Sequence, residues 1–161
     1  MASVKVTKDI GAPVETVFEL FTDVQHGPQH VSGIKGIKLL TPGRFALGTR
    51  WAETRQVLGR LDEAEMEITS FEKNRGYTVT HHKGGVRIDT EFRFEATKSN
   101  TTEVSIEFAL DPHGLPPGIL APLEWAIAGK VRGVLTQDLA DLKVAIERVS
   151  GTTREAVATS H

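Results

Sequence analysis

Apolar and polar residues alternate along most of the chain between residues 4 and 110. In the clearest run, Val86, Ile88, Thr90, Phe92 and Phe94 form one side and charged residues fill the positions between them. A period of two is typical of a strand with one buried face. It predicts seven strands, over residues 4–10, 34–40, 51–58, 61–71, 77–83, 86–95 and 103–110. The connections are short, so we expect the last six to be antiparallel neighbours.

Two other segments have helical spacing. Apolar residues from Pro13 to Val24 predict a helix of about three turns that His26-Gly27-Pro28 ends. Residues 119–149 predict one helix of about 30 residues. Its apolar stripe consists of Leu120, Leu123, Ile127, Val131, Leu135, Leu139, Leu142 and Ile146. The residues assigned to its solvated face are Asp138, Asp141, Lys143 and Glu147.

These elements predict an α+β fold with one layer of strands and one long helix. A seven-stranded sheet has one apolar face, and only the C-terminal helix is long enough to cover it. We therefore expect a curved antiparallel sheet wrapped around that helix, with short helical structure after the first strand. Residues 1–150 are expected to form a single domain. The Pro- and Gly-rich residues 111–118 favour an irregular loop, and residues 151–161 a flexible tail.

Composition narrows the classes of function. The 161 residues include 19 basic and 21 acidic side chains, a net charge of −2 that argues against a nucleic-acid-binding surface. The absence of cysteine excludes disulfides, thiolate metal sites and a cysteine nucleophile. No apolar run is long enough to span a membrane, and the first residues lack a signal-peptide core, so the expected location is the cytoplasm.

Several short motifs match one superfamily, over most of residues 4–149. They are Ile10–Asp23, Gly48–Arg55, Gly59-Arg60, Ile68–Glu72, Asp138-Leu139 and Leu142-Lys143. In these motifs the chain resembles the START-like, or SRPBCC, superfamily with the helix-grip fold, and within it the polyketide cyclase/dehydrase-like branch. The resemblance implies a cavity between the long helix and the concave sheet. A dry void of ~300 Å³ would cost ~7 kcal/mol, so such a cavity is expected to hold water, to hold a ligand, or to be closed by the helix leaning inward.

The third predicted strand carries the first candidate site residues. Strand parity places Trp51, Glu53 and Arg55 on one face. If that face is inside, Glu53 and Arg55 can pair and orient a polar group of a ligand, and the arginine keeps the carboxylate ionised. If it is outside, they form an ordinary solvated pair. Burial of the tryptophan favours the inside interpretation.

The remaining candidates lie on other strands and on the long helix. His81 shares its strand face with Tyr77, so it is either a proton donor or acceptor in the cavity or a surface histidine near the Gly84-Gly85 turn. Further candidates for the cavity wall, each of which can equally be plain core, are Met66, Ile68, Thr90, Phe92 and Ile127.

Other patterns give no catalytic centre. His26 and His30 have a helical metal-pair spacing, but Gly27 and Pro28 break the helix and no carboxylate completes a ligand set, so we expect no metal and no cofactor. Asp111 and His113 have no evident serine partner. The small residues Ala126, Gly129 and Gly133 of the long helix either make room for a ligand, allow flexing or permit close packing on the sheet.

Three functions remain open. The first is binding of a small, largely hydrophobic molecule, such as a lipid, an aromatic or a polyketide-like compound, by a monomer or homodimer. The second is a cyclase or dehydratase in which Glu53, Arg55 or His81 handles protons and an enolate oxygen. The third is a protein-interaction module, for which an exposed apolar patch would be the sign. Few groups suited to proton transfer are present, and this favours binding over catalysis.

Overall fold

A computed structural model describes the backbone of residues 3–57, 59–98, 100–111 and 117–159, and the side chains of these except 117–126 and 152–159. The strands are β1 (Ser3–Ile10), β2 (Ile34–Leu39), β3 (Arg50–Val57), β4 (Arg60–Glu72), β5 (Gly76–Lys83), β6 (Val86–Lys98) and β7 (Thr101–Asp111). The helices are α1 (Val14–Thr22), the 3-10 turn η1 (Val24–His26), α2 (Gly27–His30) and α3 (Pro117–Thr159). All seven predicted strands are present.

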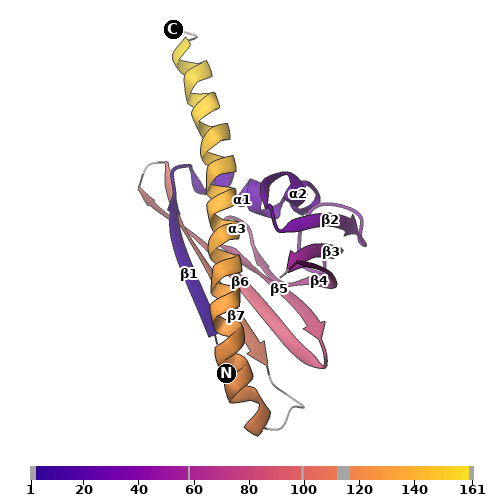
Figure 1. The fold of residues 1–161 in the computed structure, drawn as a ribbon. Coiled ribbons are helices and arrows are strands. Elements are labelled where there is room, and N and C mark those ends of the chain that lie inside the picture. Colours follow the sequence, from indigo (N-terminus) through magenta and orange to yellow (C-terminus); the bar gives the residue numbers. More distant parts are fainter. Residues whose placement is uncertain (1–2, 58, 99, 112–116, 160–161) are drawn as a thin grey trace.

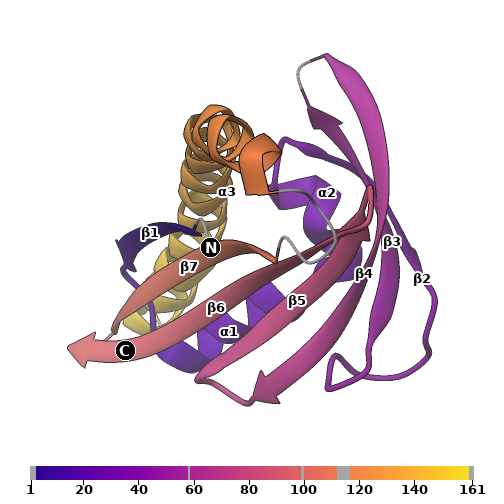
Figure 2. The ribbon, with the colours of Figure 1, turned by 90° about the horizontal axis from the view of Figure 1, so that it is seen from below.

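The strands form one antiparallel sheet in the order β1-β7-β6-β5-β4-β3-β2. The sheet curves around α3, which crosses its concave side, as Figure 2 shows. Irregular pairing in β2, β4 and β6 interrupts the ladder, and such bulges bend the strands that carry them. The predicted helix-grip architecture is therefore confirmed.

The helical segment after β1 differs in detail from its prediction. Helix α1 ends at Thr22, before the predicted stop at His26-Gly27-Pro28, and Gly27 and Pro28 begin the short helix α2. Proline is tolerated in the first turn of a helix, where its missing N–H has no partner to lose. This extra turn brings His30 and Val31 over the concave side of the sheet.

Helix α3 is longer than predicted. It runs to Thr159, ten residues beyond the predicted end at Val149, and both of its ends extend past the sheet (Figure 1). Once a helix is nucleated, each further residue adds a backbone hydrogen bond without a new nucleation cost. The flexibility of residues 151–161 stays a prediction, and most of the predicted loop, residues 112–116, lies outside the described residues.

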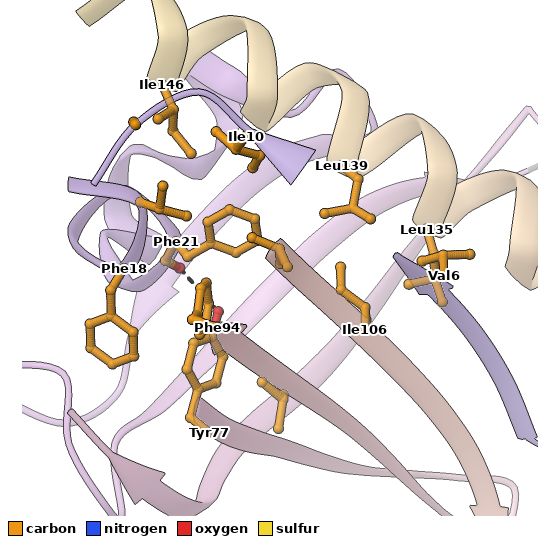
Figure 3. Close-up of a cluster of buried hydrophobic side chains, with 14 of the residues drawn as sticks. Val6, Ile10, Phe18, Phe21, Tyr77, Phe94, Ile106, Leu135, Leu139 and Ile146 are labelled. Carbon is orange, nitrogen blue, oxygen red and sulfur yellow. Dashed lines mark hydrogen bonds between the residues drawn. The ribbon is translucent and has the colours of Figure 1, made fainter. Parts of the chain in front are cut away.

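The hydrophobic core lies between α1, the middle of α3 and strands β1, β5, β6 and β7 (Figure 3). Phe18 and Phe21 of α1 pack edge-on against Phe94, with ring centroids 5.2 and 5.1 Å away. Leu135, Leu139 and Ile146 of the predicted apolar stripe are buried. The core therefore fills one end of the space under α3.

Polar contacts hold α3 on both sides of the curved sheet. Lys143 donates to the Asp9 carbonyl and Glu147 accepts from the Gly11 backbone, both beside β1. On the opposite side, Asp141 accepts from the backbone N–H and hydroxyl of Ser32. Helix α3 is therefore attached both to the β1 end of the sheet and to the loop before β2, at the other end of the sheet.

Gly129 and Gly133 of α3 are not packing sites. A Cβ at Gly129 or at Gly133 would have no neighbour within 4 Å, and both residues are exposed. The interpretation that they permit close packing on the sheet is therefore wrong, and neither residue lines the cavity described below. The side chain of Ala126 lies outside the described ones.

Candidate functional site

A cavity of about 510 Å³ lies between α3 and the concave side of the sheet. Its walls come from α1, α2, strands β2 to β7 and the face of α3 that carries Ile127, Val131 and Leu135. Most of the lining side chains are aliphatic or aromatic. The cavity volume lies in the range of ~300–1,000 Å³ that is common for small-molecule sites.

Ile68, which the sequence also offered for the cavity wall, is fully buried in the hydrophobic core and does not line the cavity. The other nine residues that the sequence suggested for ligand contact do line it. They are Trp51, Glu53, Arg55, Met66, Tyr77, His81, Thr90, Phe92 and Ile127. They lie on β3, β4, β5, β6 and α3, so residues far apart in the chain form one wall. Their contact with a ligand stays a proposal.

Strand β3 supplies the polar part of the site. Trp51 and Glu53 are only 3% and 8% exposed, so the alternating pattern turns this face inward. The Trp51 indole N–H donates to Glu53 Oε2 over 3.2 Å, and Arg55 Nε donates to Glu53 Oε1 over 3.0 Å. Both carboxylate oxygens of Glu53 therefore have a partner on their own strand.

Helix α3 completes this cluster with Asp138. Arg55 Nη1 lies 3.1 Å from Asp138 Oδ1 and 3.0 Å from Oδ2. Burial alone would lower the pKa of Arg55, but Asp138 and Glu53 together raise it, so the guanidinium stays charged. Burial raises the pKa of Asp138, and Arg55 opposes that change. We refer to Glu53, Arg55 and Asp138 as the carboxylate cluster.

The assignment of Asp138 to the solvated face of the helix was wrong. Its side chain is 16% exposed and lines the cavity. A signal was present in the sequence, because position 138 is three residues after Leu135 and four before Leu142, both on the apolar stripe. Arginine on the facing strand supplies the charge that makes burial of this carboxylate tolerable.

Gly33 also belongs to this site, and the sequence reasoning missed it. A Cβ at position 33 would lie 3.1 Å from Arg55 Nη1, so a larger residue there would press on the guanidinium. The backbone N–H of Gln56 donates to the Gly33 carbonyl, which holds this loop against β3. Glycine therefore gives Arg55 room to reach Asp138.

His81 faces the cavity from β5, whereas His82 is exposed on the other side of the strand. Burial lowers the pKa of His81, and the nearby Glu53 carboxylate opposes this change without reversing it. The imidazole is therefore neutral at pH 7 and can donate or accept a hydrogen bond in the cavity. The alternative of a surface histidine is wrong.

Stability should fall as the pH is lowered below about 6.5, in part because of His81. In the unfolded chain the imidazole takes up a proton near that pH, while in the folded protein its pKa is lower, so the unfolded state binds more protons. We expect His81→Gln to reduce the loss of unfolding free energy between pH 7 and 5. Urea unfolding at several pH values measures this, with His82→Gln on the exposed face as control.

Tyr77 is structural as well as part of the wall. Its hydroxyl donates to the Phe21 carbonyl over 3.3 Å, a bond drawn in Figure 3, and its ring stacks on Phe92 with centroids 4.6 Å apart. Burial raises the pKa of this hydroxyl. Tyr77 therefore presents ring surface, not a titrating group, to the cavity.

The described residues contain neither a cluster of metal ligands nor an unpaired buried polar side-chain atom. Among them, no three His, Asp or Glu side chains are grouped so that they could hold a metal ion. Within the same part of the chain, every buried side-chain nitrogen or oxygen has a hydrogen-bond partner. Within the site, Glu53, Arg55 and Asp138 are paired with one another, and Glu53 also accepts from Trp51.

The chain matches a family model described as polyketide cyclase / dehydrase and lipid transport over residues 1–147. It belongs to this family. A comparison with curated protein sequences finds no match. As a member of the polyketide cyclase / dehydrase family, the chain shares the expected superfamily, and the resemblance seen in its motifs is confirmed.

Solved structures of low sequence identity share the fold. A protein from Thermus thermophilus is 15% identical, with a TM-score of 0.74 over 92% of this chain and 99% of that one. A START superfamily protein from Mycobacterium smegmatis is 14% identical, with a TM-score of 0.74 over 91% and 98%. The Zhui aromatase/cyclase from a Streptomyces species is 18% identical, with a TM-score of 0.73 over 91% and 93%.

Membrane insertion through a helix has no support in the described part of the chain. None of the helices there, including α3, combines the length and the apolar character that crossing a bilayer requires.

Proposed function

We propose that this protein binds a small, largely hydrophobic molecule in the cavity between α3 and the sheet. The observation that carries the proposal is the cavity itself, about 510 Å³ with mainly apolar walls and one buried polar cluster. Such a site gains affinity from apolar burial, and the few polar groups orient the ligand. The family description, which includes lipid transport, supports the same class of ligand.

Filling the cavity should abolish binding. Ala64 of β4 lines the cavity, and Ala64→Trp would place an indole in the space of the ligand. The control is Ala52→Trp, because Ala52 lies between Trp51 and Glu53 on β3 and so points to the opposite face of the sheet. We expect at least a hundredfold weaker binding of an environment-sensitive naphthalene dye to the first variant and unchanged binding to the second.

Native mass spectrometry of gently purified protein tests the proposal without a chosen probe. We expect a retained apolar molecule in the wild type and in Ala52→Trp, and none in Ala64→Trp. Empty wild-type protein that also fails to bind the dye would contradict the proposal.

A second candidate is cyclase or dehydratase activity in the same cavity. The observation in its favour is a neutral His81 that shares the cavity with Arg55 and Glu53, since a cyclisation needs a proton acceptor and a cation near the enolate oxygen. With a poly-carbonyl substrate, Glu53→Gln and His81→Ala should each abolish turnover, measured as cyclised product, and leave dye binding measurable. Unchanged rates in both variants would remove these role assignments.

A further inference from the structure

In the carboxylate cluster at the cavity wall, negatively charged groups outnumber positively charged ones. The carboxylate cluster holds two acids, Glu53 and Asp138, and one cation, Arg55. All three side chains are at most 22% exposed, so water screens them less than it screens surface charges. Two carboxylates and one guanidinium leave one negative charge at the wall that a ligand would meet.

Arg55 already has two carboxylate partners. Its Nε is bound to Glu53 and its Nη1 to Asp138, at 3.0 Å in each case. A carboxylate of a ligand would be the third acid around one guanidinium, and like charges at short distance repel strongly where water is excluded. By contrast, each carboxylate oxygen can accept more than one hydrogen bond, so a donor group of a ligand would find acceptors.

The other charges around the cavity do not reverse this sign. Asp62 and Lys83 form an ion pair with each other, and Asp23 pairs with His26. Lys130 is exposed and lies eight residues before Asp138 on α3, about 12 Å along the helix. His81, which also faces the cavity, is neutral at pH 7 because burial lowers its pKa.

We propose that the carboxylate cluster selects ligands whose polar group donates hydrogen bonds, a hydroxyl or an ammonium, and rejects carboxylates of the same skeleton. This inference rests on the proposed binding function and names its ligand class. It predicts phenols, alcohols or amines rather than fatty-acid anions. Glu53 and Asp138 are then the residues that determine specificity.

Three naphthalenes of similar size test this selection: 2-naphthol, 2-naphthylmethylamine and 2-naphthoate at pH 7. Their affinities are measured by displacement of the dye and by calorimetry. We expect the naphthol and the amine each to bind at least tenfold more tightly than the naphthoate. Comparing the amine with the naphthoate removes the general cost of transferring a charge from water, because both are ions and only the sign differs.

Two charge-removing variants test whether Glu53 and Asp138 cause the preference for the amine over the naphthoate. Glu53→Gln and Asp138→Asn each remove one negative charge at nearly constant volume, so the preference for amine over naphthoate should fall at least fivefold. The matched control is Glu63→Gln, an exposed residue of β4 whose strand partner is Thr54, and it should keep the wild-type preference.

Each result decides between the two proposals. If none of the three compounds and no dye binds, the binding function itself fails. If they bind but the naphthoate equals the amine in the wild type, the inference fails and the binding function stands. The inference also fails if neither cluster variant changes the preference. Thermal melting identifies a variant that does not fold, and in that case the other variant and the wild-type ratio decide.

Discussion

Trp51→Ala should lower the free energy of unfolding by about 3–5 kcal/mol, the range for removal of a large buried aromatic side chain. Trp51 is 3% exposed, and its ring lies 6.1 Å from that of Phe45 between centroids. The substitution also removes the N–H that donates to Glu53 Oε2, and this leaves a buried carboxylate oxygen without that partner. Urea unfolding followed by circular dichroism measures the change.

Trp51→Phe separates packing from hydrogen bonding. It keeps most of the ring and removes the N–H, so we expect a loss of about 1–2 kcal/mol. A loss below about 1 kcal/mol for Trp51→Ala would contradict the burial of this side chain against the cluster.

Asp138→Ala should lower the free energy of unfolding by about 2–3 kcal/mol. Removing one partner of a fully buried pair costs ~3–5 kcal/mol, and the partial exposure of Arg55 and Asp138 reduces that value. The guanidinium would keep Glu53 but lose its contact with α3. The measurement is again urea unfolding, with Thr136→Ala, an exposed position on the same helix, expected within about 0.5 kcal/mol of wild type.

A combined substitution tests whether the charge or the volume matters. Replacing the whole cluster together, as Glu53→Gln, Arg55→Met and Asp138→Leu, removes all three charges and leaves no buried carboxylate without a cation, so it should recover most of the stability lost in Asp138→Ala. If the triple variant is as unstable as the sum of the three single variants, the buried charges are not the source of the effect.

The site combines a rigid frame with a space that its own side chains do not fill. Contacts of Lys143 and Glu147 beside β1, and of Asp138 and Asp141 on the other side, hold α3 across the sheet. All of these contacts are polar, and they come from residues 138–147 near the middle of α3. They fix the position of the helix over the concave side of the sheet, where the cavity lies.

Strand assignments were recoverable from the sequence because alternation is a local property. In β3 the period of two placed Trp51, Glu53 and Arg55 on one face, and the structure turns that face inward. The inward choice could be argued from Trp51 alone, since its burial is worth more than the exposure of its charged neighbours. Cavity-lining residues followed from the same parity on β5 and β6.

Residues in irregular or helical segments were less accessible to this reasoning. Gly33 gives space to a guanidinium 22 positions later in the chain, and no periodic pattern marks that need. The short helix α2 forms where Gly27 and Pro28 suggested only a break, because proline in a first helical turn costs nothing. Both features depend on neighbours that the local sequence does not specify.

The strands, the long helix and the family could be predicted from the residues alone, since these depend on periodicity and on motifs within short stretches. That Asp138 faces Arg55 instead of water became apparent only in the folded chain. That contact joins residues 83 positions apart, and it depends on where α3 crosses the sheet. An acidic residue on a helix is solvated unless a cation meets it, and the position of that cation is a property of the folded chain.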